Sequence, residues 1–157
     1  MKVSCFVNGD HWEGEVEPRA SLADFLREDL GLTGTHLGCE QGVCGSCTVL
    51  LDQAPVRSCL VLAAQVDGAV VQTVEGLAPE GKLHALQIAI SEESGLQCGF
   101  CTPGVLMTAV SILDRGGAST RDEIAEAMAG NLCRCTGYVG IINAIARVAG
   151  IRDGEHA

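Results

Sequence analysis

The chain is organised around two segments, Gln97-Cys98-Gly-Phe-Cys101-Thr-Pro-Gly104 and Asn131-Leu-Cys133-Arg-Cys135-Thr-Gly137, and each holds a close pair of cysteines. Residues 102 to 132 separate the two pairs, which have spacings of x2 and x1. A close pair chelates a metal with little loss of chain entropy, and a long gap allows helices to return the second pair to the first. The four thiols therefore predict one metal or cluster site.

The first of these pairs is expected just before a helix. Thr102 suits the N-cap and Pro103 suits the first helical position, so Cys98 and Cys101 are placed on the loop that enters the helix. The first turn of a helix has free backbone N–H groups and the positive end of the helix dipole. Both features favour an anionic thiolate cluster at this loop.

A second set of cysteines lies in Gly38-Cys39-Glu-Gln-Gly-Val-Cys44-Gly-Ser-Cys47, and Cys59 follows after eleven residues. The spacing x4 then x2, with a distant fourth cysteine, is the plant-type ferredoxin pattern for a [2Fe–2S] cluster. Glycines at 38, 42 and 45 allow the backbone to approach the cluster sulfide and to direct N–H groups at it. This segment predicts a second cluster site.

Two other uses of the nine cysteines fit the sequence less well. Disulfides are disfavoured because the count is odd and no export signal is visible. Structural zinc sites usually have two C-x2-C pairs each, which neither set here provides. Cys5 lies outside both sets and is expected in the core, on the same face of the first strand as Val3 and Val7. The histidines at 11, 36, 84 and 156 have no ligand spacing and are expected at the surface or in loops.

Composition restricts the class of protein. Twenty acidic and ten basic residues give a formal net charge of −10, which disfavours nucleic acid and anionic membranes as partners. No apolar run is long enough to span a membrane, and the polar Asn8-Gly9 follows the first strand too early for a signal peptide. There is no GxGxxG motif and no P-loop. We expect a soluble, cytoplasmic protein that binds no nucleotide of its own.

The first half of the chain predicts a sheet with one packed helix. Lys2 to Val7 and a return strand through Trp12 to Val16 form a hairpin around Asn8-Gly9. Ser21 is the expected N-cap of a helix with Leu22, Phe25, Leu26 and Leu30 on one face and Gly31 at its end. Further strands are expected over 48–51, 55–62 and 69–74.

The second half predicts four amphipathic helices. After Gly76 the hydrophobic period changes from two to about 3.6, and Pro79-Glu-Gly81 is the expected linker between the two domains. Helices are expected over 83–90, 103–113, 120–128 and 138–148, the third with a Thr120-Arg-Asp-Glu123 capping box and Gly130 as its stop. The fold class is therefore α+β, with an N-terminal domain over 1–76 and a helical domain over 77–157.

Four motifs, in this order, carry a resemblance to a known family. They are Gly38-Cys39-Glu-Gln-Gly-Val-Cys44-Gly-Ser-Cys47-Thr-Val, Arg57-Ser-Cys59-Leu, Gln97-Cys98-Gly-Phe-Cys101-Thr-Pro-Gly and Gly130-Asn-Leu-Cys133-Arg-Cys135-Thr-Gly-Tyr. Together they resemble the iron–sulfur subunit of the xanthine oxidase family of molybdenum hydroxylases. The likeness spans nearly the whole chain, and no cysteine position departs from the family pattern.

The resemblance implies a plant-ferredoxin-like (β-grasp) domain followed by a four-helix domain, each with one [2Fe–2S] cluster. It implies that Cys98, Cys101, Cys133 and Cys135 ligate the cluster proximal to the molybdenum centre, and that Cys39, Cys44, Cys47 and Cys59 ligate the distal one. Gln97 and Cys135 resemble positions that also contact the pterin. The implied partners are a large subunit with a molybdopterin cofactor and a medium FAD subunit, or a cytochrome, assembled as a dimer of heterotrimers.

The implied role is an electron relay, because a [2Fe–2S] cluster accepts one electron and two in series divide a two-electron oxidation into single steps. The acidic chain is expected to lower the cluster potentials. The rival hypothesis is a free two-cluster ferredoxin. It is disfavoured because half of the chain is expected to enclose the second cluster, whereas a free carrier needs an exposed one. A zinc-bound adaptor is a third hypothesis. The substrate (aldehyde, purine, nitrogen heterocycle, carbon monoxide or aromatic thioester) and the final acceptor stay open.

Overall fold

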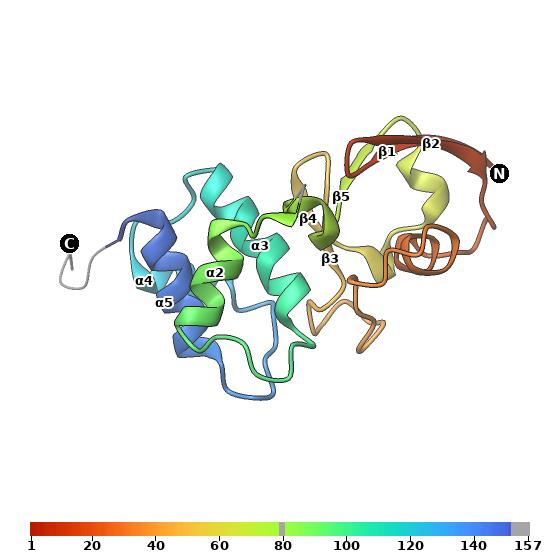
Figure 1. Cartoon of the computed structure of the whole chain (residues 1–157). Helices are drawn as coiled ribbons and strands as arrows, with labels where there is room; N and C mark the ends of the chain where they lie inside the picture. The colour runs from red at the N-terminus through yellow and green to blue at the C-terminus, as the bar shows by residue number, and fades with distance from the viewer. Residues whose placement is uncertain (79–80, 152–157) are drawn as a thin grey trace.

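The computed structural model describes residues 1–78 and 81–151 and places a sheet and a group of helices side by side (Figure 1). The sheet has the order β2-β1-β5-β3-β4. Its strands are β1 (Lys2–Val7), β2 (Asp10–Glu15), β3 (Thr48–Leu51), β4 (Ala54–Arg57) and β5 (Val70–Gln72). Only β1 and β5 pair in parallel, and the other neighbours are antiparallel.

The hairpin at the N-terminus forms as its sequence predicts. Asn8 and Gly9 both have positive φ, 53° and 92°, as the two central residues of a type I′ turn require. Cys5 is buried together with Val3 and Val7, which confirms it as a core residue. Pro79 and Glu80 of the expected linker, and the C-terminal residues that include His156, lie outside the described residues.

The helix over this sheet is shorter and less regular than expected. It begins as α1 (Leu22–Asp24) with a capping box between Ser21 and Asp24, and continues as a π-helical turn, η1 (Phe25–Asp29). The turn ends where the Leu30 N–H donates to the Phe25 carbonyl, five residues back. Of the apolar side chains predicted for its inner face, Leu22, Phe25 and Leu26 are buried against the sheet, and Leu30 is partly buried.

The strand expected over 55–62 stops at Arg57, because the chain turns there to bring Cys59 back towards Cys47. It forms a 3₁₀ turn, η2 (Ser58–Leu60). The Ser58 hydroxyl and N–H both donate to the Cys47 carbonyl, at 2.7 and 3.3 Å. Two further 3₁₀ turns, η3 (Ala63–Val66) and η4 (Val74–Leu77), flank β5.

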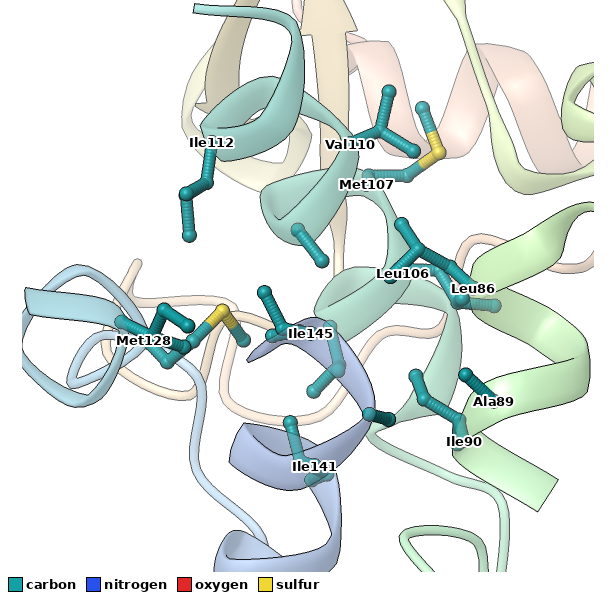
Figure 2. Packing of buried hydrophobic residues seen from close by; sticks show 14 of the residues in the cluster. Leu86, Ala89, Ile90, Leu106, Met107, Val110, Ile112, Met128, Ile141 and Ile145 are labelled. Atoms are coloured by element: carbon teal, nitrogen blue, oxygen red, sulfur yellow. The ribbon is translucent and has the colours of Figure 1, made fainter. Parts of the chain in front are cut away.

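Four helices follow, as predicted: α2 (Ala85–Glu92), α3 (Thr102–Asp114), α4 (Arg121–Ala127) and α5 (Tyr138–Ala149). α2 begins later than expected because the His84 side chain accepts from Leu86 N–H and caps it. The capping box at Thr120 forms, and Gly150 ends α5 with a φ of 74°. Figure 2 shows Leu86, Ile90, Leu106, Ile141 and Ile145 converging in the helical core.

α3 differs from an amphipathic helix, because every residue from Gly104 to Ile112 is buried. One side of α3 packs against α2, and the other packs against β3 and β4. Leu50 of β3 accordingly belongs to the core of the helical part. The central helix in Figure 1 thus joins the two halves of the molecule. In the described part of the chain, no helix has the length and hydrophobicity needed to cross a membrane.

Candidate metal centres

The N-terminal cysteine set lies on the loop before β3 and on η2. Cys39 accepts hydrogen bonds at its sulfur from the N–H groups of Gln41 and Cys44, both at 3.4 Å. Cys47 is buried immediately before β3, and the Ser58 hydrogen bonds hold Cys59 next to it. The backbone around these thiols thus points N–H groups inward, as the glycine-rich segment predicts.

The second set lies at the ends of α3 and α5. Cys98 and Cys101 precede α3, whereas Cys133 and Cys135 precede α5. The Cys133 N–H donates to the Tyr138 hydroxyl at 2.8 Å, and the Gly137 N–H donates to the Cys133 sulfur at 3.3 Å. These bonds fold the loop around its thiols.

The capping predicted for α3 is wrong by one residue. Cys101 occupies the N-cap with no side-chain hydrogen bond, Thr102 is the first helical residue, and Pro103 follows it. Thr102 therefore does not cap the helix, since it already lies inside the first turn. Its N–H donates to the Gly99 carbonyl at 3.2 Å. Cys101 itself stands at the helix N-terminus, closer to the positive end of the helix dipole than expected.

The thiols interact two by two. The thiols of Cys39 and Cys44 and those of Cys47 and Cys59 influence each other electrostatically in one set, as do Cys98 with Cys135 and Cys101 with Cys133 in the other. Each pair in the second set combines one cysteine from each loop. The long gap in the sequence is therefore closed by α3 and α4, as the pair spacing predicts.

The environment divides the thiols into acidic and weakly acidic members. The N–H groups of Cys44 and Gln41 lower the pKa of Cys39 to about 6, and the Phe100 N–H lowers the pKa of Cys98. Burial raises the pKa of Cys59 to about 11 and that of Cys101 to about 12. A ligating thiol must be deprotonated, so metal binding at either set releases protons.

This donor set fits a cluster with two irons. Each set offers four thiols in two pairs, so that each pair would supply two ligands to one iron, and N–H groups point at the sulfurs. Within residues 1–78 and 81–151, no three His, Cys, Asp or Glu side chains are arranged around a single metal ion. Two pairs of thiols with N–H donors at their sulfurs suit the two irons of a [2Fe–2S] cluster.

The two sets open onto one shared hollow of about 380 Å³. Its lining combines Cys44 of the first set with three cysteines of the second, and it includes Phe100, Leu132 and Tyr138. The His36 ring stacks on the Phe100 ring, with centroids 5.0 Å apart, and its Nδ1–H donates to the Phe100 carbonyl at 2.8 Å. His36 thus connects the loop before Cys39 to the loop of Cys98, a contact that no sequence spacing indicated.

Large apolar side chains beside the cysteines are exposed. Val43 and Leu60 flank the first set with 61% of their surface exposed, and Val139 near the second set has 71% exposed. Gln97 and Cys98 are exposed too. Within the second set only Cys98 is exposed, whereas Cys133 is buried and Cys101 and Cys135 are half-buried. The helical part therefore encloses the second set on one side and leaves it open at Cys98.

A ferredoxin-like sheet and a four-helix unit, each with four paired thiols, define a two-cluster electron-transfer protein. The family described as "2Fe-2S iron-sulfur cluster binding domain" matches residues 5–78, and the one described as "[2Fe-2S] binding domain" matches residues 73–146. Caffeine dehydrogenase subunit gamma from Pseudomonas sp. (strain CBB1) is 55% identical over 150 residues, which cover 94% of this chain and 90% of that protein.

Two more relatives extend the match. Subunit beta of the 6-hydroxypseudooxynicotine dehydrogenase complex from Paenarthrobacter nicotinovorans is 53% identical and covers 98% of this chain and 96% of its own. The structure of quinoline 2-oxidoreductase from Pseudomonas putida 86 matches with a TM-score of 0.91 at 56% identity, over 99% of this chain and 98% of that chain. The chain belongs to the small iron–sulfur subunits of the xanthine oxidase family of molybdenum hydroxylases. It is an electron-transfer subunit of an oxidoreductase complex.

Proposed function

We propose that each cysteine set holds one [2Fe–2S] cluster, the distal one on Cys39, Cys44, Cys47 and Cys59 and the proximal one on Cys98, Cys101, Cys133 and Cys135. The observation that carries the proposal is that the fold gathers the thiols of each set and aims backbone N–H groups at their sulfurs, from Gln41 and Cys44 in the first set and from Gly137 in the second. When bound, each cluster accepts and returns one electron at a time. The N–H groups that donate to Cys39 and Cys133 stabilise thiolate sulfur and so help to set the potential of each site.

The exposed surface at the second set supports a role as a subunit. A partner can reach Gln97, Cys98 and the half-buried Cys135. Exposed apolar side chains lie beside them, and such groups often mark a surface that another protein covers. We assign this surface to a large subunit with a molybdopterin cofactor, whose pterin contacts Gln97 and Cys135. Electrons then enter at the proximal set and leave through the distal set.

Membership of the family supports a proposal for the wider assembly. A medium subunit with FAD, or a cytochrome, accepts electrons from the distal set, and the complex is a cytoplasmic dimer of heterotrimers. The division of the chain into residues 1–76 and 77–157 is consistent with the family matches, which meet between residues 73 and 78.

The substrate of the complex belongs to a narrower class than the sequence indicated. The names of the three relatives include caffeine, 6-hydroxypseudooxynicotine and quinoline. Each of these compounds contains a nitrogen heterocycle. Since identity exceeds half over nearly the full chain in each case, we assign a nitrogen heteroaromatic substrate to the large subunit. The residues that select it are not in this chain.

Gentle purification from the native cells tests the proposal. A tag on this chain is expected to retain a much larger chain, molybdenum and about four irons per tagged chain, the content of two [2Fe–2S] clusters. The purified complex should oxidise quinoline or a purine and give two distinct reduced-cluster signals in electron paramagnetic resonance. A chain that purifies alone with both clusters and reduces unrelated enzymes would instead be a free ferredoxin, and a colourless zinc protein would refute both roles.

A further inference from the structure

A backbone hydrogen bond joins the two cysteine loops directly. The N–H of Leu132 donates to the carbonyl of Cys44 at 2.8 Å. Leu132 is covalently next to Cys133 of the second set, and Cys44 belongs to the first set. A path from one set to the other therefore follows covalent bonds except at this single hydrogen bond. No step across empty space is needed.

Two further bonds hold the same short segment against the N-terminal domain. The Asn131 side-chain amide donates to the Gly45 carbonyl at 3.1 Å, and the Arg57 guanidinium donates to the Gly130 carbonyl at 2.7 Å. Asn131 is 3% exposed, whereas the Arg57 bond is at the surface. Three consecutive residues before Cys133 thus each bond to the other domain, with the buried asparagine in the middle.

Asn131 is itself fixed from the helical side. Its Oδ1 accepts from the Thr108 hydroxyl of α3 at 3.0 Å, so one side chain connects α3 to the first cysteine loop. Both of its neighbours keep a second partner without it. The Thr48 hydroxyl also donates to the Gly45 carbonyl, at 2.6 Å, and the Thr108 hydroxyl can donate to the Gly104 carbonyl at 3.0 Å.

These alternative partners separate two roles for Asn131. Asn131 is not needed merely to satisfy buried polar groups, because its removal leaves the Gly45 carbonyl and the Thr108 hydroxyl each with another hydrogen-bond partner. What its removal does change is the position of residues 130–132 relative to Cys44 and Gly45. The geometry therefore indicates that Asn131 sets the distance and alignment of the Leu132–Cys44 bond.

We propose that Asn131 is a positioning residue for electron transfer between the two cysteine sets, acting through the Leu132 N–H···O=C Cys44 bond. This inference rests on the proposed function. One electron leaves the reduced helical-domain site, which is thereby oxidised, and reduces the N-terminal site. No proton or covalent bond is exchanged. Electronic coupling falls more steeply through space than through bonds, so a lengthened contact slows this step.

The test compares Asn131→Ala with Arg115→Ala in the purified complex. Arg115 donates to the Gln53 carbonyl at 2.9 Å, so it also connects the helical part to the sheet, but far from both cysteine sets. Three quantities are measured: hydrogen exchange at the Leu132 amide, the magnetic interaction between the two reduced clusters, and the rate of electron transfer between the sites after reduction by one electron. Cluster content is the control for folding.

For Asn131→Ala we expect full cluster content, about tenfold faster exchange at Leu132 as that bond loosens, a changed magnetic interaction and a several-fold slower inter-site rate. Arg115→Ala should leave all three unchanged. Thr108→Val, which removes the hydroxyl behind Asn131, should shift the same quantities in the same direction and serves as the test if Asn131→Ala does not fold.

Two results would overturn the inference while the proposed function stands. One is an unchanged inter-site rate and unchanged magnetic interaction in Asn131→Ala or, where that variant does not fold, in Thr108→Val. The other is equal slowing in Arg115→Ala, which would assign the effect to domain contact in general. A wild-type complex without two cluster signals would overturn the inference and the proposed function together.

Discussion

At the scale of single residues, glycine permits the two cysteine loops to touch through their backbones. Gly45 has a φ of +77°, and a Cβ there would overlap the carbonyl oxygen of Gly130. A Cβ at Gly104, in the first turn of α3, would overlap the carbonyl oxygen of Gly45. The hydrogen bonds between the loops depend on this close approach, because any side chain at these positions would separate them.

We expect Gly45→Ala to loosen the contact between the loops, and Gly68→Ala is its matched control. Gly68 has a φ of +76° but nothing within 4 Å of its Cβ position. Gly68→Ala should cost only the roughly 1–2 kcal/mol of a left-handed alanine. Gly45→Ala should cost more and should also speed hydrogen exchange at Leu132. Equal losses of unfolding free energy in both variants, with Leu132 unaffected, would contradict the steric argument.

Gln97 provides the second prediction at this scale. Its side chain is exposed beside Cys98, so a partner's polar cofactor can reach it. Gln97→Ala should keep both clusters but weaken the seating of the pterin cofactor by roughly 1–3 kcal/mol, the loss of one buried hydrogen bond. Molybdenum retained after dilution reports this loss, with the exposed Gln72→Ala in β5 as control. If the two variants retain molybdenum equally, Gln97 is an ordinary loop residue.

Among the helices and strands, the elements that follow from a local sequence pattern were predicted correctly. The contacts that depend on residues distant in the sequence were missed. The alternation in Val3, Cys5 and Val7 and the Asn8-Gly9 turn were sufficient for the hairpin. The apolar run in α3 did not reveal that the sheet covers its second side. Cysteine spacing correctly indicated two sets, but Asn131 and Leu132 bond to residues more than 80 positions away, and no local pattern encodes such contacts.

The N-terminus of α4 gives a prediction about one element. The Thr120 hydroxyl accepts from the Glu123 N–H at 3.2 Å, while the Glu123 carboxylate accepts from the N–H groups of Ser119 and Thr120. These bonds, led by that of Ser119, hold the pKa of Glu123 below its usual value. Thr120→Ala should destabilise α4 by about 1 kcal/mol, measured by amide exchange within the helix. Ser119→Ala keeps the backbone donor and should have little effect, so equal effects would count against the capping role.

At the scale of the whole molecule, two hydrophobic cores are built without the cysteine loops as their centre. One lies under the sheet around Phe25 and Leu26, and the other surrounds α3. Metal-free protein should therefore keep strands and helices, while the loops 38–47, 97–101 and 131–137 lose order, since the cluster is their cross-link. Limited proteolysis and near-ultraviolet circular dichroism test this. Metal-free protein whose loops resist protease as well as the loaded protein would show that the chain alone orders them.

The order of the two sites in the relay decides what the loss of one cluster does. Cys44→Ser replaces one thiolate of the N-terminal set by a harder ligand that suits cluster iron poorly, but the backbone carbonyl that receives the Leu132 N–H is retained. Because the helical part has its own four cysteines, its cluster should survive, although α3 packs against β3. In the anaerobic complex, substrate should still reduce the helical-domain site, while electron delivery to the external acceptor nearly stops. Electron paramagnetic resonance measures the reduction of the helical-domain site, and steady-state turnover measures delivery to the acceptor. Cys98→Ser should give the reciprocal result, with the N-terminal site intact but not reduced. Turnover at the wild-type rate without the N-terminal cluster would exclude a series relay, because electrons would then leave by another route.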